Sequence, residues 1–113
     1  HLFSTYGLVT STQVYAAAIA QRTTRLRIGM AVCAIPFNHP LRTASDYALV
    51  DVLSHGRLDF GVGRAYQPHE FVGLGVPMEQ SRSMLGDCCS HPTASRASRS
   101  SRSRICQTAS GCS

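Results

Sequence analysis

GRLDFGVGRAYQPHEFVGLG, residues Gly56–Gly75, is the stretch that decides the fold class of this chain. It reads as a helix stop at Gly56, a short strand over Leu58–Val62 and a glycine-rich loop that carries one arginine, Arg64. This order places a cation and small residues at the carboxyl end of a strand. In α/β proteins, phosphorylated ligands bind at that end of the strands. The stretch therefore predicts an α/β fold with an anion site near Arg64.

The flanking segments predict further helices and strands. Apolar spacing predicts a helix over Gln13–Arg22, and the nearly continuous apolar run LRIGMAVCAI predicts a buried strand over Leu26–Ile35. A second helix is expected over Leu41–Leu53. Its apolar face is expected to consist of Leu41, Ala44, Ala48 and Val52, with Tyr47 and Leu49 beside it. Residues 63–77 are expected to form a loop of roughly fifteen residues, and Met78–Leu85 to open a third helix.

This order of elements implies a parallel sheet with helices on the outside. Two parallel strands cannot cover their own faces and edges. We therefore expect the chain to be part of a larger barrel or open sheet, and these patterns alone do not choose between the two. The chain begins at His1 rather than Met, which we interpret as a missing N-terminal portion.

Composition separates a globular part, residues 1–85, from a Ser-, Arg- and Cys-rich tail, residues 86–113. The formal net charge of the chain is +5, and the tail carries most of it. All 11 basic residues are arginine. The tail cannot bury enough apolar area to offset its ordering entropy, so disorder is expected. We interpret it as translation in a shifted frame of GC-rich DNA; the alternative is an Arg/Ser-rich segment that binds nucleic acid.

Cysteine usage predicts a reducing, cytoplasmic environment. Cys33 lies in an apolar run and is expected in the core. The four tail cysteines match no zinc-binding spacing, so no metal site is expected. No signal peptide is recognisable, and no apolar stretch is long enough to span a bilayer. Neither a metal nor a membrane is therefore expected as a partner.

Several segments resemble, in the same order and at the same spacing, the bacterial luciferase-like flavin-dependent monooxygenases. Residues 1–8 resemble the family segment HHF…FGL, residues 28–42 resemble GTAV..LP..HPVR, and residues 53–64 resemble LS.GR..FG.GRG. The resemblance covers about residues 1–85 and none of the tail. It implies a fragment of a (β/α)8 TIM barrel, from about the end of the second strand to the start of the fourth helix.

The resemblance implies a function for the intact parent. The intact parent is expected to be a monooxygenase or related oxidoreductase that uses reduced FMN and O2 on a small organic substrate. The alternatives are a deazaflavin-dependent hydride-transfer enzyme and a non-enzymatic remnant with a nucleic-acid-binding tail. A flavin reductase and a second copy of the parent are the implied protein partners. The fragment itself is expected to be inactive, because a barrel site is assembled from several strands.

Three residues are implied to lie at the flavin ring. His1 matches the first histidine of a family pair that moves protons near the flavin, although Leu2 replaces the second histidine. Ala31 and Val32 match the position of a non-proline cis peptide bond beneath the ring.

Three further residues are implied to hold the cofactor phosphate. Arg64 matches the arginine that contacts the FMN phosphate, and a guanidinium can bind a phosphate through two hydrogen bonds. From the residues alone, the alternative for Arg64 is a surface ion pair with Glu70. Gly63 precedes this arginine. Ala65 follows it where the family has glycine, which narrows the allowed backbone angles.

Overall fold

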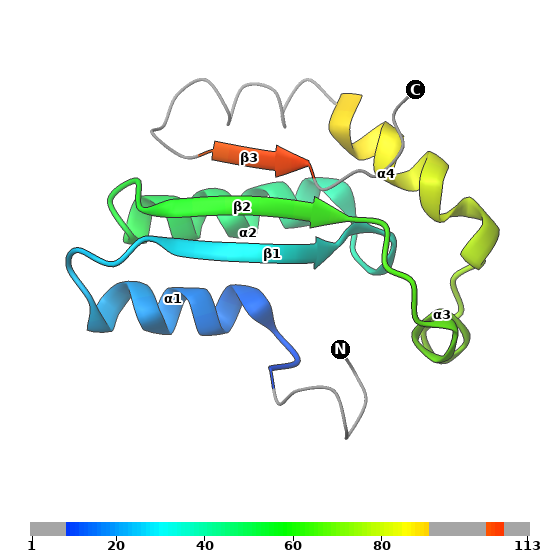
Figure 1. Cartoon of the computed structure of the whole chain (residues 1–113), viewed down its shortest axis with the longest axis horizontal. Coiled ribbons are helices and arrows are strands. Elements are labelled where there is room, and N and C mark those ends of the chain that lie inside the picture. Colours follow the sequence, from blue (N-terminus) through cyan, green and yellow to red (C-terminus); the bar gives the residue numbers. More distant parts are fainter. Residues whose placement is uncertain (1–8, 91–103, 108–113) are drawn as a thin grey trace.

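The chain forms a small parallel sheet with helices packed on one face and at one end (Figure 1). The computed structural model describes residues 9–90 and 104–107. The elements in chain order are α1 (Thr12–Arg22), β1 (Ile28–Ala34), the 3-10 helix η1 (Ile35–Phe37), α2 (Pro40–Leu53), β2 (Leu58–Gly63), α3 (Pro68–Leu74), the 3-10 helix η2 (Met78–Gln80), α4 (Ser81–Ser90) and β3 (Arg104–Gln107). The mixed α/β class expected from apolar periodicity is confirmed.

The sheet has the order β1-β2-β3, and both pairings are parallel. The register of β1 on β2 runs from Ile28 opposite Leu58 to Ala34 opposite Gly63. Figure 1 shows the arrowheads of β1 and β2 pointing the same way, with α3 beyond them. The segments that follow the two strands therefore meet at one edge of the sheet.

One face of the sheet carries the core. The helices α1 and α2 contact each other, α1 contacts β1, and α2 contacts β2. The buried cluster between these elements consists of Ala16, Ala20, Ile28, Cys33, Tyr47, Val50 and Leu58. Two alanines on the buried side of α1 let its backbone approach the sheet closely. The expected core position of Cys33 is confirmed, since its exposed fraction is 4%.

A buried phenol links α1 to α2 inside this core. The hydroxyl groups of Tyr47 and Thr12 share a hydrogen bond of 2.6 Å. The Tyr47 ring also packs on the Phe60 ring, with 4.1 Å between the ring centroids. Burial raises the pKa of the Tyr47 phenol, so this hydroxyl stays protonated and can serve the Thr12 contact.

The expected apolar face of α2 is wrong. The residues of α2 that are buried are Thr43, Tyr47 and Val50, whereas Leu41 is 48% exposed and Val52 is 70% exposed. Two of these buried residues have hydrogen-bonded hydroxyl groups: Thr43 Oγ1 donates to the backbone carbonyl of His39 one turn earlier at 3.2 Å, and the Tyr47 hydroxyl bonds Thr12 of α1. Hydrogen bonding thus lets polar residues face the sheet.

The expected loop over residues 63–77 is also wrong, because it contains α3. Pro68 occupies the first turn of this helix, and Gly75 ends it in the left-handed conformation with a φ of 67°. The Val76 N–H donates to the Phe71 carbonyl at 2.9 Å, which completes a Schellman-type stop. These proline and glycine signals were present in the sequence and favour a short helix.

Two segments of the predicted tail have regular structure, and disorder of the tail as a whole stays a prediction. The helix α4 continues past Leu85 to Ser90, and β3 pairs in parallel with β2. A strand edge such as that of β2 offers unpaired backbone groups, and another segment of the chain can bond them whatever its composition. The rest of the tail, residues 91–103 and 108–113, lies outside the described residues.

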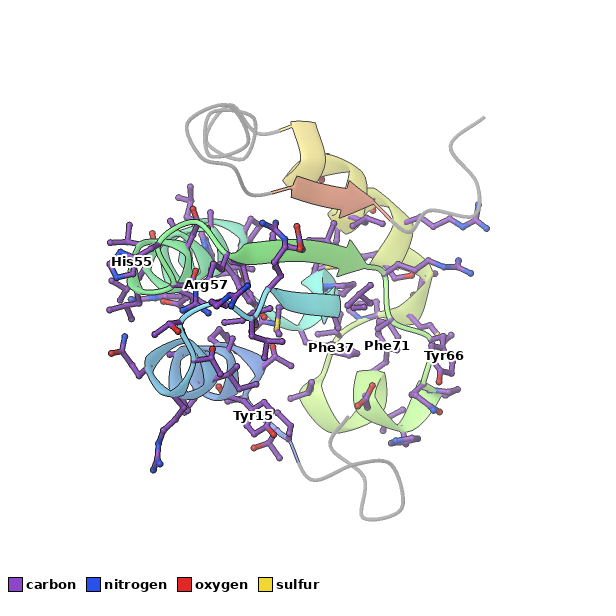
Figure 2. All side chains as sticks on the ribbon, turned by 60° about the vertical axis from the view of Figure 1, so that its left-hand side comes forward. Tyr15, Phe37, His55, Arg57, Tyr66 and Phe71 are labelled. Atoms are coloured by element: carbon purple, nitrogen blue, oxygen red, sulfur yellow. The ribbon has the colours of Figure 1, made fainter. Side chains whose placement is uncertain are left out.

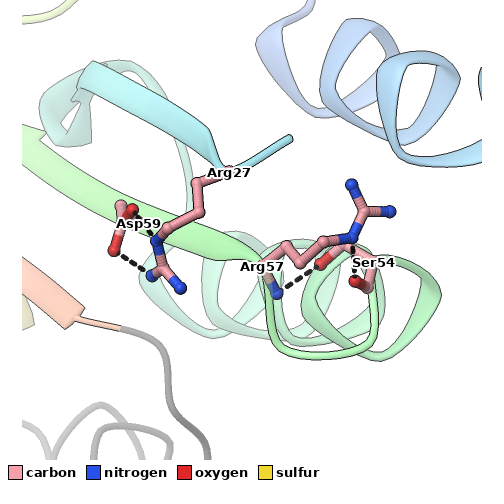
Figure 3. A network of polar contacts seen from close by, with 4 residues as sticks. All are labelled: Arg27, Ser54, Arg57 and Asp59. Atoms are coloured by element: carbon pink, nitrogen blue, oxygen red, sulfur yellow. Dashed lines mark hydrogen bonds and ion pairs between the residues drawn. The ribbon is translucent and has the colours of Figure 1, made fainter. Parts of the chain in front are cut away.

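The amino end of the sheet is held by Arg57, whose role was not predicted. All five of its guanidinium N–H groups donate hydrogen bonds at 2.7–3.0 Å. The acceptors are the backbone carbonyls of Ala20, Thr23, Leu26 and Ser54 and the Thr23 hydroxyl. Figure 3 shows the part of this network that reaches Ser54, beside the separate ion pair of Arg27 with Asp59. Arg57 therefore joins the end of α1 to the turn after α2.

Candidate functional site

The structure brings five of the six predicted site residues to one edge of the sheet. Ala31 and Val32 lie in the carboxyl half of β1, and Gly63 ends β2. Arg64 and Ala65 follow Gly63 directly. Because β1 and β2 are neighbouring parallel strands, these residues share the carboxyl edge, where ligands bind in α/β folds. The sixth residue, His1, lies outside the described residues.

The strand β1 is irregular at the first two of these residues. Met30 pairs with Phe60 and Cys33 pairs with Val62, so β1 has one residue more than β2 between these pairs. Ala31 and Val32 occupy this bulge, and the peptide bond between them is cis, as the resemblance implies. Bulges turn side chains away from the regular alternation and are common beside active sites.

Val32 and Gly63 form a close contact between the two strands. A β-carbon added to Gly63 would lie 2.6 Å from Val32 Cγ2 and 3.4 Å from Val32 Cβ. Only glycine leaves room for the Val32 side chain at this point. The side chain of one predicted cofactor residue, Val32, thus requires glycine at another, residue 63.

The backbone beside this contact is open. Ala31 in the bulge is exposed, and so is Gly29, which lies nearer the amino end of β1. A β-carbon added to Gly29 would meet no atom within 4 Å. The exposure of Ala31 leaves the backbone of the bulge accessible to a flat group.

Arg64 is an available cation at this edge. Its side chain is exposed, and within residues 9–90 and 104–107 no hydrogen bond or ion pair occupies its guanidinium. The alternative of an ion pair with Glu70 is not observed in that part of the chain; Glu70 is instead buried in α3, with an exposed fraction of 5%. An unpaired guanidinium at the carboxyl edge is suited to bind a phosphate.

Ala65, which stands where the family has glycine, adopts the left-handed conformation. Its φ is 60°, which is costly for a residue with a β-carbon. We expect Ala65→Gly to raise the free energy of unfolding by about 0.5–1 kcal/mol, measured by urea denaturation. Ala48→Gly, at an exposed position inside α2, is the matched control and should lower it by about 1 kcal/mol. Equal losses in both variants would contradict a strained Ala65.

The described residues contain no other group of side chains as well placed for binding or catalysis as those at the carboxyl edge. Within residues 9–90 and 104–107, no group of three or more His, Cys, Asp or Glu side chains could hold a metal ion. His39 caps α2, and His55 lies in the turn after it. None of the described helices is both long and apolar enough to cross a bilayer.

Comparison with known proteins matches the part of the chain that carries the candidate site. The family model described as luciferase-like monooxygenase matches residues 1–90, which include every predicted site residue. The chain belongs to the luciferase-like monooxygenase family. Its members include the alkanal monooxygenase alpha chain of Photobacterium phosphoreum, which is 39% identical over 87 residues, covering 77% of this chain and 25% of that protein.

Two further relatives place the chain among monooxygenases. The limonene 1,2-monooxygenase of Rhodococcus erythropolis is 37% identical over 68% of this chain and 20% of its own length. The crystal structure of the monooxygenase RslO1 from Streptomyces bottropensis superposes with a TM-score of 0.74 at 37% identity, covering 78% of this chain and 27% of RslO1. The luciferase-like chain thus spans about a quarter of the length of the relatives that it matches.

The residues present fit the phosphate and ring of a flavin. The Arg64 guanidinium, which has no bonding partner among the described residues, suits a phosphate, and the exposed backbone at Ala31 suits a flat ring. Sequence reasoning missed the aromatic contact between Phe37 and Phe71 at the same edge (Figure 2). No pattern in the sequence relates these two residues, because they come from different elements.

Proposed function

We propose that this luciferase-like chain carries part of the flavin site of a flavin-dependent monooxygenase. The parent would act with reduced flavin and O2 on a small organic substrate. When bound, the reduced flavin supplies the reaction with O2, and the protein supplies binding and orientation. The observation that supports this proposal most strongly is the exposed Arg64 after the carboxyl end of β2, where no described residue pairs with its guanidinium.

The other residues have assigned roles in this proposal. Arg64 holds the cofactor phosphate, with the backbone around Gly63 and Ala65 giving it access. Ala31 and Val32 lie against the flavin ring. His1, at the start of the chain, moves a proton near the ring. The 113-residue chain by itself is proposed to bind cofactor without turnover.

The described elements are proposed to form one segment of a (β/α)8 barrel. The alternation of parallel strands with outer helices supports this arrangement. The helices α1 and α2 would lie on the outside, and Ala31 would point inward. A cytoplasmic location and a flavin reductase as electron donor complete the proposal.

A comparison of FMN with riboflavin tests the assignment of Arg64, since the two flavins differ only by the phosphate. We expect the full chain to prefer FMN, measured by equilibrium dialysis with fluorescence detection. In Arg64→Ala this preference should fall about tenfold, because a charge-assisted contact to phosphate is lost. Arg25→Ala, which removes another exposed arginine with no bonding partner in the described part of the chain, is the matched control and should keep the preference.

Two outcomes would change the proposal. An unaltered preference in Arg64→Ala would remove the phosphate role of this residue. Tighter binding of a phosphorylated deazaflavin than of FMN, with the same dependence on Arg64, would favour a hydride-transfer enzyme over a monooxygenase.

A further inference from the structure

The position of Arg64 depends on the backbone that carries it. Its guanidinium has no partner in the described part of the chain, so no side-chain contact fixes it there. Upstream, Gly63 is held by its register opposite Ala34 of β1. Downstream, residues 64–67 have no regular structure before α3 begins at Pro68. Whatever anchors α3 therefore limits the movement of Arg64.

The helix α3 buries two side chains, those of Glu70 and Phe71, and Phe71 is its buried apolar contact. Phe71 is 2% exposed, whereas its neighbour Val72 is 82% exposed and Leu74 is 44% exposed. The left-handed Gly75 ends the helix with two backbone hydrogen bonds, so the short helix keeps its shape. Removing the packing of Phe71 would remove the apolar contact through which α3 is attached.

The ring of Phe71 contacts Phe37, which belongs to the segment after β1. The ring centroids are 4.8 Å apart with an interplanar angle of 65°, an edge-to-face arrangement. Figure 2 shows the two side chains together at the carboxyl end of the sheet. Phe37 is itself well placed, because Ile35 of the same turn is buried and Asn38 donates to the Ala34 carbonyl at 3.1 Å.

We propose that Phe37 and Phe71 are positioning residues that hold Arg64 at the place where it meets the cofactor phosphate. The Phe37–Phe71 contact joins the segment after β1 to the segment after β2. Arg64 lies between this contact and the paired end of β2, so its backbone is restrained on both sides. This inference rests on the proposed function, in which Arg64 binds a flavin phosphate.

The preference for FMN over riboflavin separates positioning from simple stability. Loss of folded protein weakens the binding of both flavins equally, whereas displacement of Arg64 weakens only the binding of FMN. We expect Phe71→Leu and Phe37→Leu each to lower the preference about fivefold, because a small displacement of a binding group is costly. The double variant should lower it no further, since both substitutions break one contact.

Two controls accompany these variants in the full chain. Phe60→Leu makes the same substitution in the other aromatic pair, that with Tyr47, and should keep the preference. Phe37→Tyr keeps the ring, and its hydroxyl can reach solvent because Phe37 is only partly buried, so it should also keep the preference. If circular dichroism shows that Phe71→Leu does not fold, Phe37→Leu and Phe37→Tyr decide whether the contact positions Arg64.

The outcomes distinguish this inference from the proposed function. An unchanged preference in Phe37→Leu and Phe71→Leu, together with a loss in Arg64→Ala, overturns the positioning role alone. No loss in Arg64→Ala overturns the phosphate site and the positioning role together. An equal loss in Phe60→Leu also overturns the inference, because the effect would then follow from general loss of packing.

Discussion

Replacing Arg57 with alanine is expected to lower the free energy of unfolding by about 3 kcal/mol, the largest effect of any substitution considered for this chain. The guanidinium donates to three carbonyls at the end of α1 and in the segment before β1, those of Ala20, Thr23 and Leu26. In Arg57→Ala these carbonyls lose their donor, and the helix end regains the unsatisfied groups that every helix terminus has. Urea denaturation followed by circular dichroism measures the change.

Two substitutions control this experiment. Arg57→Lys keeps the charge but has three donors in place of five, so it should recover only part of the loss. Arg27→Ala removes an arginine whose hydrogen bonds go to the exposed carboxylate of Asp59, and it should change stability far less. A loss in Arg57→Ala no larger than that in Arg27→Ala would show that the network does not hold α1 to the sheet.

Replacing Gly63 with alanine is expected to lower the free energy of unfolding by about 2 kcal/mol, because the new β-carbon would overlap the Val32 side chain. Valine is branched at its β-carbon and has few alternative rotamers, so it cannot move aside cheaply. Adjustment of β1 or β2 would then be required at the carboxyl edge. Thermal or urea denaturation measures the loss.

The double variant Val32→Ala/Gly63→Ala tests the cause of that loss. Removing the two γ-carbons of Val32 makes room for the alanine at residue 63, so stability should return to near that of Val32→Ala alone. Gly29→Ala is the matched control, because an added β-carbon there meets no atom within 4 Å. Additive losses in the double variant would show that the contact with Val32 is not what requires glycine.

Local chemistry made most of the fold predictable. The apolar periodicity of residues 13–22 and 41–53 specified α1 and α2, and the apolar run before Ile35 specified a parallel strand. The expected burial of that strand is wrong in part, since only Ile28 and Cys33 of β1 are buried. Gly56 has a left-handed φ of 76° after α2, but the left-handed stop of the helix begins one residue earlier, at His55, whose φ is 55°. Such features depend on residues close together in the chain, so a sequence carries them directly.

The candidate site was predictable only in part. The order strand, Gly63, Arg64 is local, and its place at the carboxyl edge follows from the parallel sheet. Pro68 at the start of α3 and Gly75 after its end were also present in the sequence, although a long loop was expected there. A better reading of these helix signals would have found α3.

The sequence by itself determined the order of helices and strands, the parallel sheet and the arginine that follows β2. Only the tertiary structure decided which face of α2 is buried, that β3 pairs with β2, that Gly63 must leave room for Val32, and that Phe37 meets Phe71. Each of these depends on atoms that lie far apart in the chain. Close packing selects such contacts through shape and hydrogen bonding, which no local pattern of residues records.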